Sequence, residues 1–124
     1  MKLHASDTKK YQTVTGYFPG GVEINAQPFD YSLLVLPETE PRAWPVASFE
    51  QLTLEHFEQL LAEQPDVVIL GTGERQRFVH PRLTAPLTSR QIGVECMDTN
   101  AACRTYNILM GERRKALLAL IIEK

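Results

Sequence analysis

The chain has 124 residues, which predicts one domain over residues 1–124 with a single hydrophobic core and excludes a multidomain enzyme. Apolar residues make up 44% and charged residues 23%, fractions typical of globular proteins, which excludes a disordered or fibrous chain. The 13 basic and 15 acidic side chains give a net charge of −2, so the chain lacks the basic footprint of a protein that binds nucleic acid or an anionic membrane surface.

The start of the chain carries no sign of export or import. Residues 1–7 contain neither an apolar core nor an arginine-rich amphipathic leader, so we expect a cytoplasmic protein. The longest apolar run, residues 116–122, is far shorter than the ~20 residues that span a bilayer, so no membrane insertion is expected. Cys96 and Cys103 lack CxxC spacing and are predicted to be reduced core residues.

The first half of the chain reads mainly as strands. Residues 14–18 and 22–24 flank a Pro-Gly-Gly connection whose glycines can take positive φ, which predicts an N-terminal β-hairpin. Residues 31–36 form a nearly continuous apolar run and are predicted to be a strand. Three prolines within residues 37–45 then predict an extended, loop-rich stretch, because proline cannot donate to a β-ladder.

The middle of the chain has the order of a helix, a strand and a glycine loop. Thr53 is a good N-cap for a helix that ends near residues 64–65, and its apolar stripe repeats at helical period. That stripe consists of Leu54, Phe57, Leu60 and Leu61. Residues 66–70 are apolar and β-branched, as in a central strand covered on both faces, and residues 71–73 break it. This order is typical of α/β proteins.

Another helix, strand and helix are predicted further along the chain. Residues 81–90 have helical composition, with Pro86 expected to kink the helix or to restart it from Thr84. Residues 93–97 follow as a strand.

The last part of the chain predicts a capped helix and a final strand. Asp98 and Thr99 provide an N-cap for a helix that runs to about Met110, with Gly111 closing it in the usual C-terminal position. Residues 116–122 are apolar and are interpreted as a strand, although their alanine and leucine content also suits a helix.

Three segments together carry a family resemblance: PDVVILGTG at residues 65–73, IGVECMDTNAACRTYNIL at 92–109, and GERRK at 111–115 before the terminal apolar strand. The chain resembles a family of uncharacterised α/β domains whose mitochondrial members include assembly factor three of the NADH:ubiquinone oxidoreductase complex. The resemblance implies a three-layer α/β domain with a mixed central sheet whose last strand is antiparallel to its neighbours. It also implies a bacterial member with no established catalytic activity. The mitochondrial relatives act as assembly factors through protein contacts.

The glycine loop has two interpretations. Gly71 and Gly73 after a strand suggest a dinucleotide site, but Gln76 stands where a third glycine is needed, and Glu95 lies inside a strand instead of at its end. A structural turn that lets the backbone reverse is therefore the preferred interpretation.

A crevice is expected beside this loop. If the strands before Gly71 and Asp98 are neighbours, then Gly71, Thr72, Gly73, Asp98 and Thr99 line one edge of the sheet, where ligands bind in open α/β folds. Free N–H groups at a helix start would suit a small ligand or an anion. The alternative is a purely structural N-cap, because the carboxylate at position 98 satisfies one of those donors itself.

No complete catalytic or metal-binding pattern is visible. The histidines at positions 4, 56 and 80 are scattered, without HxxxH or HxxE spacing, and no serine lies in a GxSxG elbow. Both cysteines lie in apolar patterns, which favours small core residues over a thiol pair. We therefore expect no catalytic residues, no metal and no cofactor.

One face of the last helix is polar. Asn100, Arg104 and Asn107 share it, and it is interpreted either as a solvated face or as a recognition surface for a partner protein. Arg104 has two further interpretations: an ion pair with Glu112 or Asp98, or a place in an anion site beside the glycine loop.

The family resemblance, together with the lack of a complete catalytic pattern, therefore implies a non-enzymatic domain that acts by contact with an unknown protein partner. The alternative is a protein, an enzyme or a binder, that takes a small molecule or anion in the crevice of the glycine loop.

Overall fold

The computed structural model describes residues 11–124, so the expectations for residues 1–7 and for His4 lie outside the described residues. The described chain contains three α-helices: α1 (Leu54–Leu61), α2 (Pro81–Thr88) and α3 (Thr99–Gly111). Its eight strands are β1 (Val14–Phe18), β2 (Gly21–Ile24), β3 (Gln27–Phe29), β4 (Leu33–Leu36), β5 (Thr39–Ala43), β6 (Val67–Gly71), β7 (Gly93–Met97) and β8 (Ala116–Leu120). A short 3₁₀-helix, Phe49–Gln51, precedes α1.

The strands form two antiparallel or mixed sheets. The small sheet has the order β1-β2-β3, and the large sheet has the order β5-β4-β8-β6-β7. In the large sheet β6 runs parallel to β7 and β8, whereas β8 runs antiparallel to β4 and β4 antiparallel to β5. The mixed sheet and the β1–β2 hairpin are as predicted, and β3 extends that hairpin to a third strand.

The direction of the last strand corrects one prediction. β8 is antiparallel to β4, as expected, but it is parallel to its other neighbour, β6. The physical reason is the helix between β7 and β8, because a helical crossover returns the chain to the end of the sheet where the preceding strand began.

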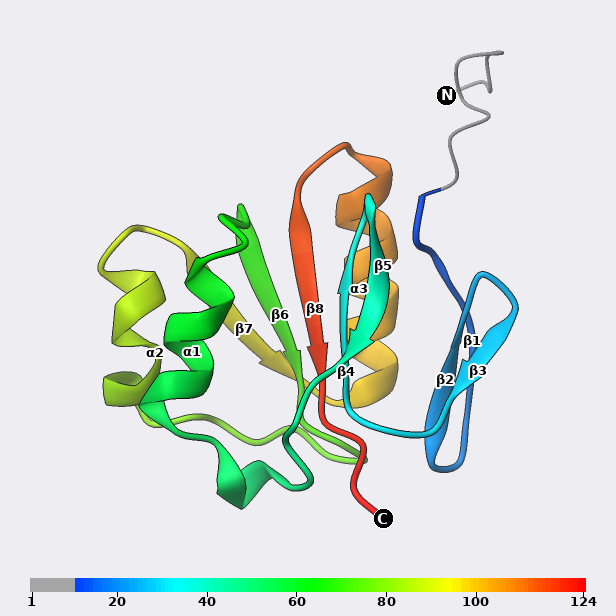
Figure 1. Ribbon diagram of the computed structural model, residues 1–124, viewed down its shortest axis with the longest axis horizontal. Coiled ribbons are helices and arrows are strands. Elements are labelled where there is room, and N and C mark those ends of the chain that lie inside the picture. Colours follow the sequence, from blue (N-terminus) through cyan, green and yellow to red (C-terminus); the bar gives the residue numbers. More distant parts are fainter. Residues whose placement is uncertain (1–10) are drawn as a thin grey trace.

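Helices cover both faces of the large sheet, so the domain has the predicted three layers (Figure 1). Strand β8 is buried throughout and its residues alternate between two cores. Leu118 and Leu120 belong to the core that includes α3, and Leu117 and Ala119 belong to the core that includes α1 and α2. A strand buried on both faces needs an unbroken apolar run, which is the pattern of residues 116–122.

The proline-rich stretch is partly regular. Residues 39–43 form β5, where the sequence predicted an extended loop. This strand lies at the edge of the sheet, so Pro41 can occupy it without interrupting a ladder on both sides.

The helix ends differ in detail from the predictions. Thr53 and His56 form a capping box at the start of α1, as the sequence suggests for Thr53, whereas Leu54 remains 42% exposed. Helix α2 is continuous from its first residue through Pro86, and its cap is the ring nitrogen of His80 instead of Thr84.

The end of α3 also departs from expectation. Gly111 lies inside the helix, and the residue with left-handed backbone beyond it is Arg113, at φ 67°. The glycine was predicted because it takes this conformation at lowest cost, although other residues adopt it near helix ends.

Two side chains of α3 hold the small sheet in place. The amide of Asn107 accepts from Val14 N at 3.0 Å and donates to Val14 O at 2.8 Å. The hydroxyl of the buried Tyr106 donates to Gln12 O at 2.7 Å. These bonds fix β1 beside α3, where Figure 1 shows the small sheet, and thereby place the end of the hairpin near the start of α3.

Candidate functional site

The strands β6 and β7 are parallel neighbours, as the predicted crevice requires, with Gly71 paired to Met97 at their ends. Two backbone hydrogen bonds join the loops that follow them. Thr72 N donates to Met97 O and Thr99 N donates to Gly73 O, both at 2.8 Å. The glycine loop and the start of α3 therefore form one continuous edge.

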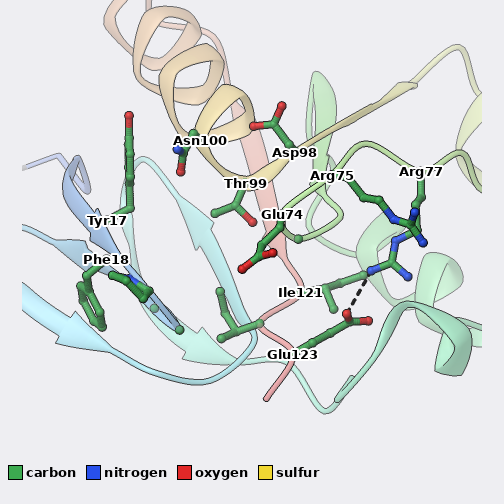
Figure 2. Close-up of a pocket in the computed structure, with 15 residues that line it drawn as sticks. Tyr17, Phe18, Glu74, Arg75, Arg77, Asp98, Thr99, Asn100, Ile121 and Glu123 are labelled. Carbon is green, nitrogen blue, oxygen red and sulfur yellow. Dashed lines mark hydrogen bonds and ion pairs between the residues drawn. The ribbon is translucent and has the colours of Figure 1, made fainter.

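An open cavity of about 740 Å³ lies along this edge (Figure 2). Its walls are the end of the β1–β2 hairpin, residues 17–21, the loop after β6, the first turn of α3, and residues 121–123. Of the predicted ligand-binding residues, Gly73, Asp98 and Thr99 line the cavity, whereas Gly71, Thr72 and Arg104 do not.

Gly71 and Thr72 serve the architecture of this edge. A Cβ on Gly71 would lie 2.6 Å from Leu120 Cδ2 and 3.3 Å from Ala102 Cβ, so this position packs between β8 and α3. The buried hydroxyl of Thr72 donates to Arg75 O at 2.7 Å, lies 3.1 Å from Met97 O, and accepts from Arg77 N at 3.1 Å.

Gly73 takes φ 102°, a backbone conformation that residues with a Cβ rarely adopt. Because glycine adopts positive φ at little cost, this residue makes the tight turn that the sequence predicted. Gly71 has ordinary backbone angles and is required for space instead.

The N-terminus of α3 has few donors left for a ligand. Thr99 N–H is bonded to Gly73 O, and Ala101 N–H donates to the carboxylate of Asp98 at 2.9 Å, which is the predicted N-cap. Among the N–H groups that precede the helical ladder, that of Asn100 has no acceptor within residues 11–124. The carboxylate also offsets the positive end of the helix dipole.

An arginine network closes the far end of the cavity. Arg77 Nη2 donates to Thr72 O and to Glu123 Oε1, both at 3.0 Å, and Nη1 lies 3.4 Å from Glu50 Oε2. Its guanidinium carbon lies 4.7 Å from the centroid of the Phe49 ring, a cation–π contact.

The same network fixes the carboxylate of Glu123. Phe49 N donates to its Oε2 at 2.7 Å. This hydrogen bond is the main reason that the pKa of Glu123 lies below its usual range; burial opposes the shift, and Arg77 and Arg75 lower the pKa further. Glu123 is therefore an anion that joins the end of the chain to the 3₁₀-helix and the loop after β6.

The three polar residues of the last helix have different places. Asn100 is exposed and lines the cavity, and Arg104 is exposed and makes no ion pair within residues 11–124, with Glu112 or Asp98 included. Asn107 uses its amide to hold Val14, as described above. Along one face of α3, Asn100 thus lines the cavity, Arg104 is exposed to solvent, and Asn107 is hydrogen-bonded to β1.

The sequence analysis missed the aromatic wall of the cavity. Tyr17 and Phe18, at the end of β1, are 43% and 41% exposed. A signal was available, because adjacent residues of a strand point to opposite faces and both cannot enter one core. Sequence reasoning also missed the contributions of Glu74, Arg75, Arg77 and Glu123, whose placement depends on how distant segments meet.

Among residues 11–124, no three His, Cys, Asp or Glu side chains gather where they could hold a metal ion. Two of the histidines, His56 and His80, act as helix caps. No helix in this part of the chain has the length and apolar character needed to cross a bilayer.

The cysteines lie apart from the cavity. Cys103 is 1% exposed in the core beneath α3, and Cys96 is half-buried on β7. Burial raises the pKa of the Cys103 thiol from its ordinary 9.0 to about 12, against a smaller opposite effect of Arg104. Burial also raises the pKa of Cys96.

We expect both thiols to react slowly with a thiol reagent at neutral pH in the native protein and rapidly in urea, because the reactive thiolate is suppressed. Cys103→Ser should lower the free energy of unfolding by about 1–2 kcal/mol, since it buries a hydroxyl without an assured acceptor. Titration with a chromogenic disulfide and urea melts check both results. Rapid modification of native Cys103 would contradict the core assignment.

This chain is similar to curated proteins from a vertebrate and from a bacterium. A zebrafish (Danio rerio) protein named NADH dehydrogenase [ubiquinone] 1 alpha subcomplex assembly factor 3 is 36% identical over 110 residues, which are 87% of this chain and 63% of that protein. A Francisella tularensis protein named 13 kDa major membrane protein is 26% identical over 76 residues, covering 61% of this chain and 62% of that protein. The chain thus spans about three fifths of the length of these curated relatives.

Solved structures agree with the fold. The crystal structure of a Bordetella parapertussis protein is 38% identical to this chain and superposes with a TM-score of 0.87, over 92% of this chain and 98% of that one. Residues 14–121 match the family described as protein of unknown function (DUF498/DUF598). This match includes almost every element that builds the cavity, and the chain belongs to that family.

Proposed function

We propose that the chain is a non-enzymatic protein-interaction domain of the assembly type, and that the cavity beside the glycine loop is where a partner protein docks. The observation that carries this proposal is the pair of exposed aromatic side chains, Tyr17 and Phe18, on the cavity wall. Aromatic residues of this kind contribute large contact areas, typically ~150–250 Å² each, and are enriched among the residues that dominate binding energy. Relatives named as assembly factors add support.

The polar groups around the cavity also favour docking over catalysis. Thr72, Asp98 and Arg77 each make internal hydrogen bonds that hold the edge together. A nucleophile or general base needs a reactive group within reach of a substrate, and the buried Cys103 lies elsewhere.

The test compares two surface variants. The double variant Tyr17→Ser, Phe18→Ser should reduce recovery of cross-linked partner from host extract about tenfold or more, as expected for loss of interface hot spots. The control is Ile108→Ser, on α3, which is 61% exposed and does not line the cavity. Quantitative mass spectrometry measures recovery, and melting temperatures confirm that both variants fold. Equal recovery of partners by the two variants would reject the cavity as the docking surface.

An anion-binding function remains the second candidate, and one observation favours it. The Nε of Arg77 is buried without an acceptor within residues 11–124, so an anion could complete its hydrogen bonding. Two features weaken this candidate: the other nitrogens of Arg77 already hold Glu123 and Glu50, and the N–H groups of Thr99 and Ala101 at the start of α3 are already bonded. A thermal-shift titration with phosphate and sulfate should therefore stay flat, whereas a saturable rise in melting temperature would support the anion.

We also propose a cytoplasmic location. The supporting observations are the near-balanced charge and the absence, within residues 11–124, of a helix that could span a membrane. Fractionation of host cells checks this location, and recovery with washed membranes would instead link the chain to its Francisella relative.

A further inference from the structure

The charged groups that line the cavity separate toward two ends. Arg77 is paired with Glu123 at one end, and the charge of Arg75 also acts on that carboxylate, lowering its pKa. Figure 2 shows both arginines on the side of the cavity away from the aromatic hairpin. Arg77 is therefore paired with an acid, and Arg75 lies on the same side of the cavity.

The other end carries an unpaired acid. Glu74 is exposed, and its carboxylate makes no hydrogen bond or ion pair within residues 11–124. Figure 2 shows it pointing into the space between its own loop and the hairpin that bears Tyr17 and Phe18. Thr99 and Asn100 lie above this space and add polar side chains that can accept hydrogen bonds.

The total charge agrees with this division. The lining holds three carboxylates and two guanidinium groups, from Glu74, Asp98, Glu123, Arg75 and Arg77. Asp98 is engaged at the helix start and Glu123 by Arg77, which leaves Glu74 as the carboxylate of the lining without a partner within residues 11–124. Close charges count most, because salt screens exposed charges beyond a Debye length of roughly 8–10 Å.

We propose that this end of the cavity receives a lysine or arginine side chain of a partner protein, whose charged group contacts Glu74 and whose apolar stem lies against the ring of Tyr17. This inference rests on the proposed docking function and specifies the chemistry of the docked segment. Aromatic faces attract cations, and the long stems of lysine and arginine pack well on apolar surface.

Other occupants fit this end less well. An acidic side chain would face the carboxylate of Glu74, and like charges at close range repel. A purely apolar side chain would remove water from that carboxylate without giving it a hydrogen-bond or ion-pair partner, which is unfavourable. A cation supplies the missing partner and still uses the aromatic wall.

The experiment uses capped pentapeptides, Gly-Gly-X-Gly-Gly, in which X is lysine, arginine, norleucine or glutamate. They are titrated into the whole ¹⁵N-labelled protein at low salt, and amide shifts are followed by NMR. The lysine and arginine peptides should shift the amides of residues 17–21, 73–75 and 99–100, with affinities at least about fivefold above norleucine and glutamate, and salt should weaken them.

Two variants locate the effect. Glu74→Gln should lower the affinity for the lysine and arginine peptides about fivefold or more and leave the affinity for the norleucine peptide unchanged, because only a positively charged side chain pairs with the carboxylate. Glu58→Gln, which removes an exposed acid of α1 outside the cavity, is the matched control and should change nothing.

The outcomes separate this inference from the docking function itself. Equal affinity for all four peptides, tighter binding of the glutamate peptide, or peptide affinities unchanged by Glu74→Gln would overturn the proposal that a lysine or arginine side chain binds here. If Glu74→Gln retains the cross-linked partner that the Tyr17 and Phe18 variant loses, docking at the cavity stands and the cationic residue is rejected. If the aromatic variant also keeps the partner, the docking proposal fails first.

Discussion

Replacing Gly71 by valine is expected to lower the free energy of unfolding by about 3 kcal/mol, the upper part of the range for overpacked cores. The cause is steric. A Cβ here would already lie 2.6 Å from Leu120 Cδ2 and 3.3 Å from Ala102 Cβ, and valine adds two further methyl groups between β8 and α3. Urea denaturation monitored by circular dichroism measures the loss.

Two other glycines provide the comparison. Gly73→Val should cost roughly 1–3 kcal/mol through its backbone, because its φ of 102° is strained for any residue with a Cβ while the space around it is adequate. Gly111→Ala should be neutral or stabilising by up to about 1 kcal/mol, since nothing lies within 4 Å of a Cβ there and alanine favours helices. Equal urea midpoints for the Gly71 variant and the native protein would refute the tight packing of β6 between β8 and α3.

Elements with strong local patterns could be predicted from the sequence. The apolar run of β6, the capped helix that starts after Asp98 and the hairpin at residues 14–24 all lie where their patterns place them. Strand β5 could not be predicted by the same reasoning, because its prolines argue against a ladder unless the strand is known to lie at an edge. Whether β8 runs parallel or antiparallel to a neighbour depends on sheet order, which no local pattern records.

The candidate site was predictable in part. Gly73, Asp98 and Thr99 meet at one edge because parallel neighbouring strands end together, a rule that needs only the strand assignments. The opposite wall was not predictable. Tyr17 and Glu74 are far apart in the chain, and they face one cavity because α3 holds the hairpin in place.

Helical periodicity has a similar limit. It groups Asn100 with Asn107 on one face of α3, and a surface that binds a partner is a reasonable interpretation of such a face. The structure places Asn100 at the cavity and engages Asn107 with Val14, 93 residues earlier. Periodicity identifies which residues share a face, but tertiary packing decides what that face meets.

Asn107→Ala is accordingly expected to lower the free energy of unfolding by about 3 kcal/mol, because it leaves both the N–H and the C=O of the buried Val14 without their partners. Asn107→Asp should also be destabilising, since a carboxylate can accept from Val14 N but cannot donate to Val14 O. Asn100→Ala, the same change about two turns earlier on the same face of α3, should alter the free energy of unfolding by no more than about 0.5 kcal/mol. Urea melts of the three variants give these differences.

Hydrogen exchange and peptide binding test independently whether the two hydrogen bonds between Asn107 and Val14 hold the hairpin in place. If Asn107 holds the hairpin beside α3, its loss should speed hydrogen exchange in β1 and β2 more than in β6, because only the small sheet depends on those two bonds. The lysine pentapeptide should then bind the folded Asn107→Ala protein more weakly, although Asn107 does not line the cavity, because the aromatic wall would no longer be fixed opposite Glu74. Uniform exchange across both sheets would make Asn107 an ordinary stabilising residue and separate the hairpin's position from this helix.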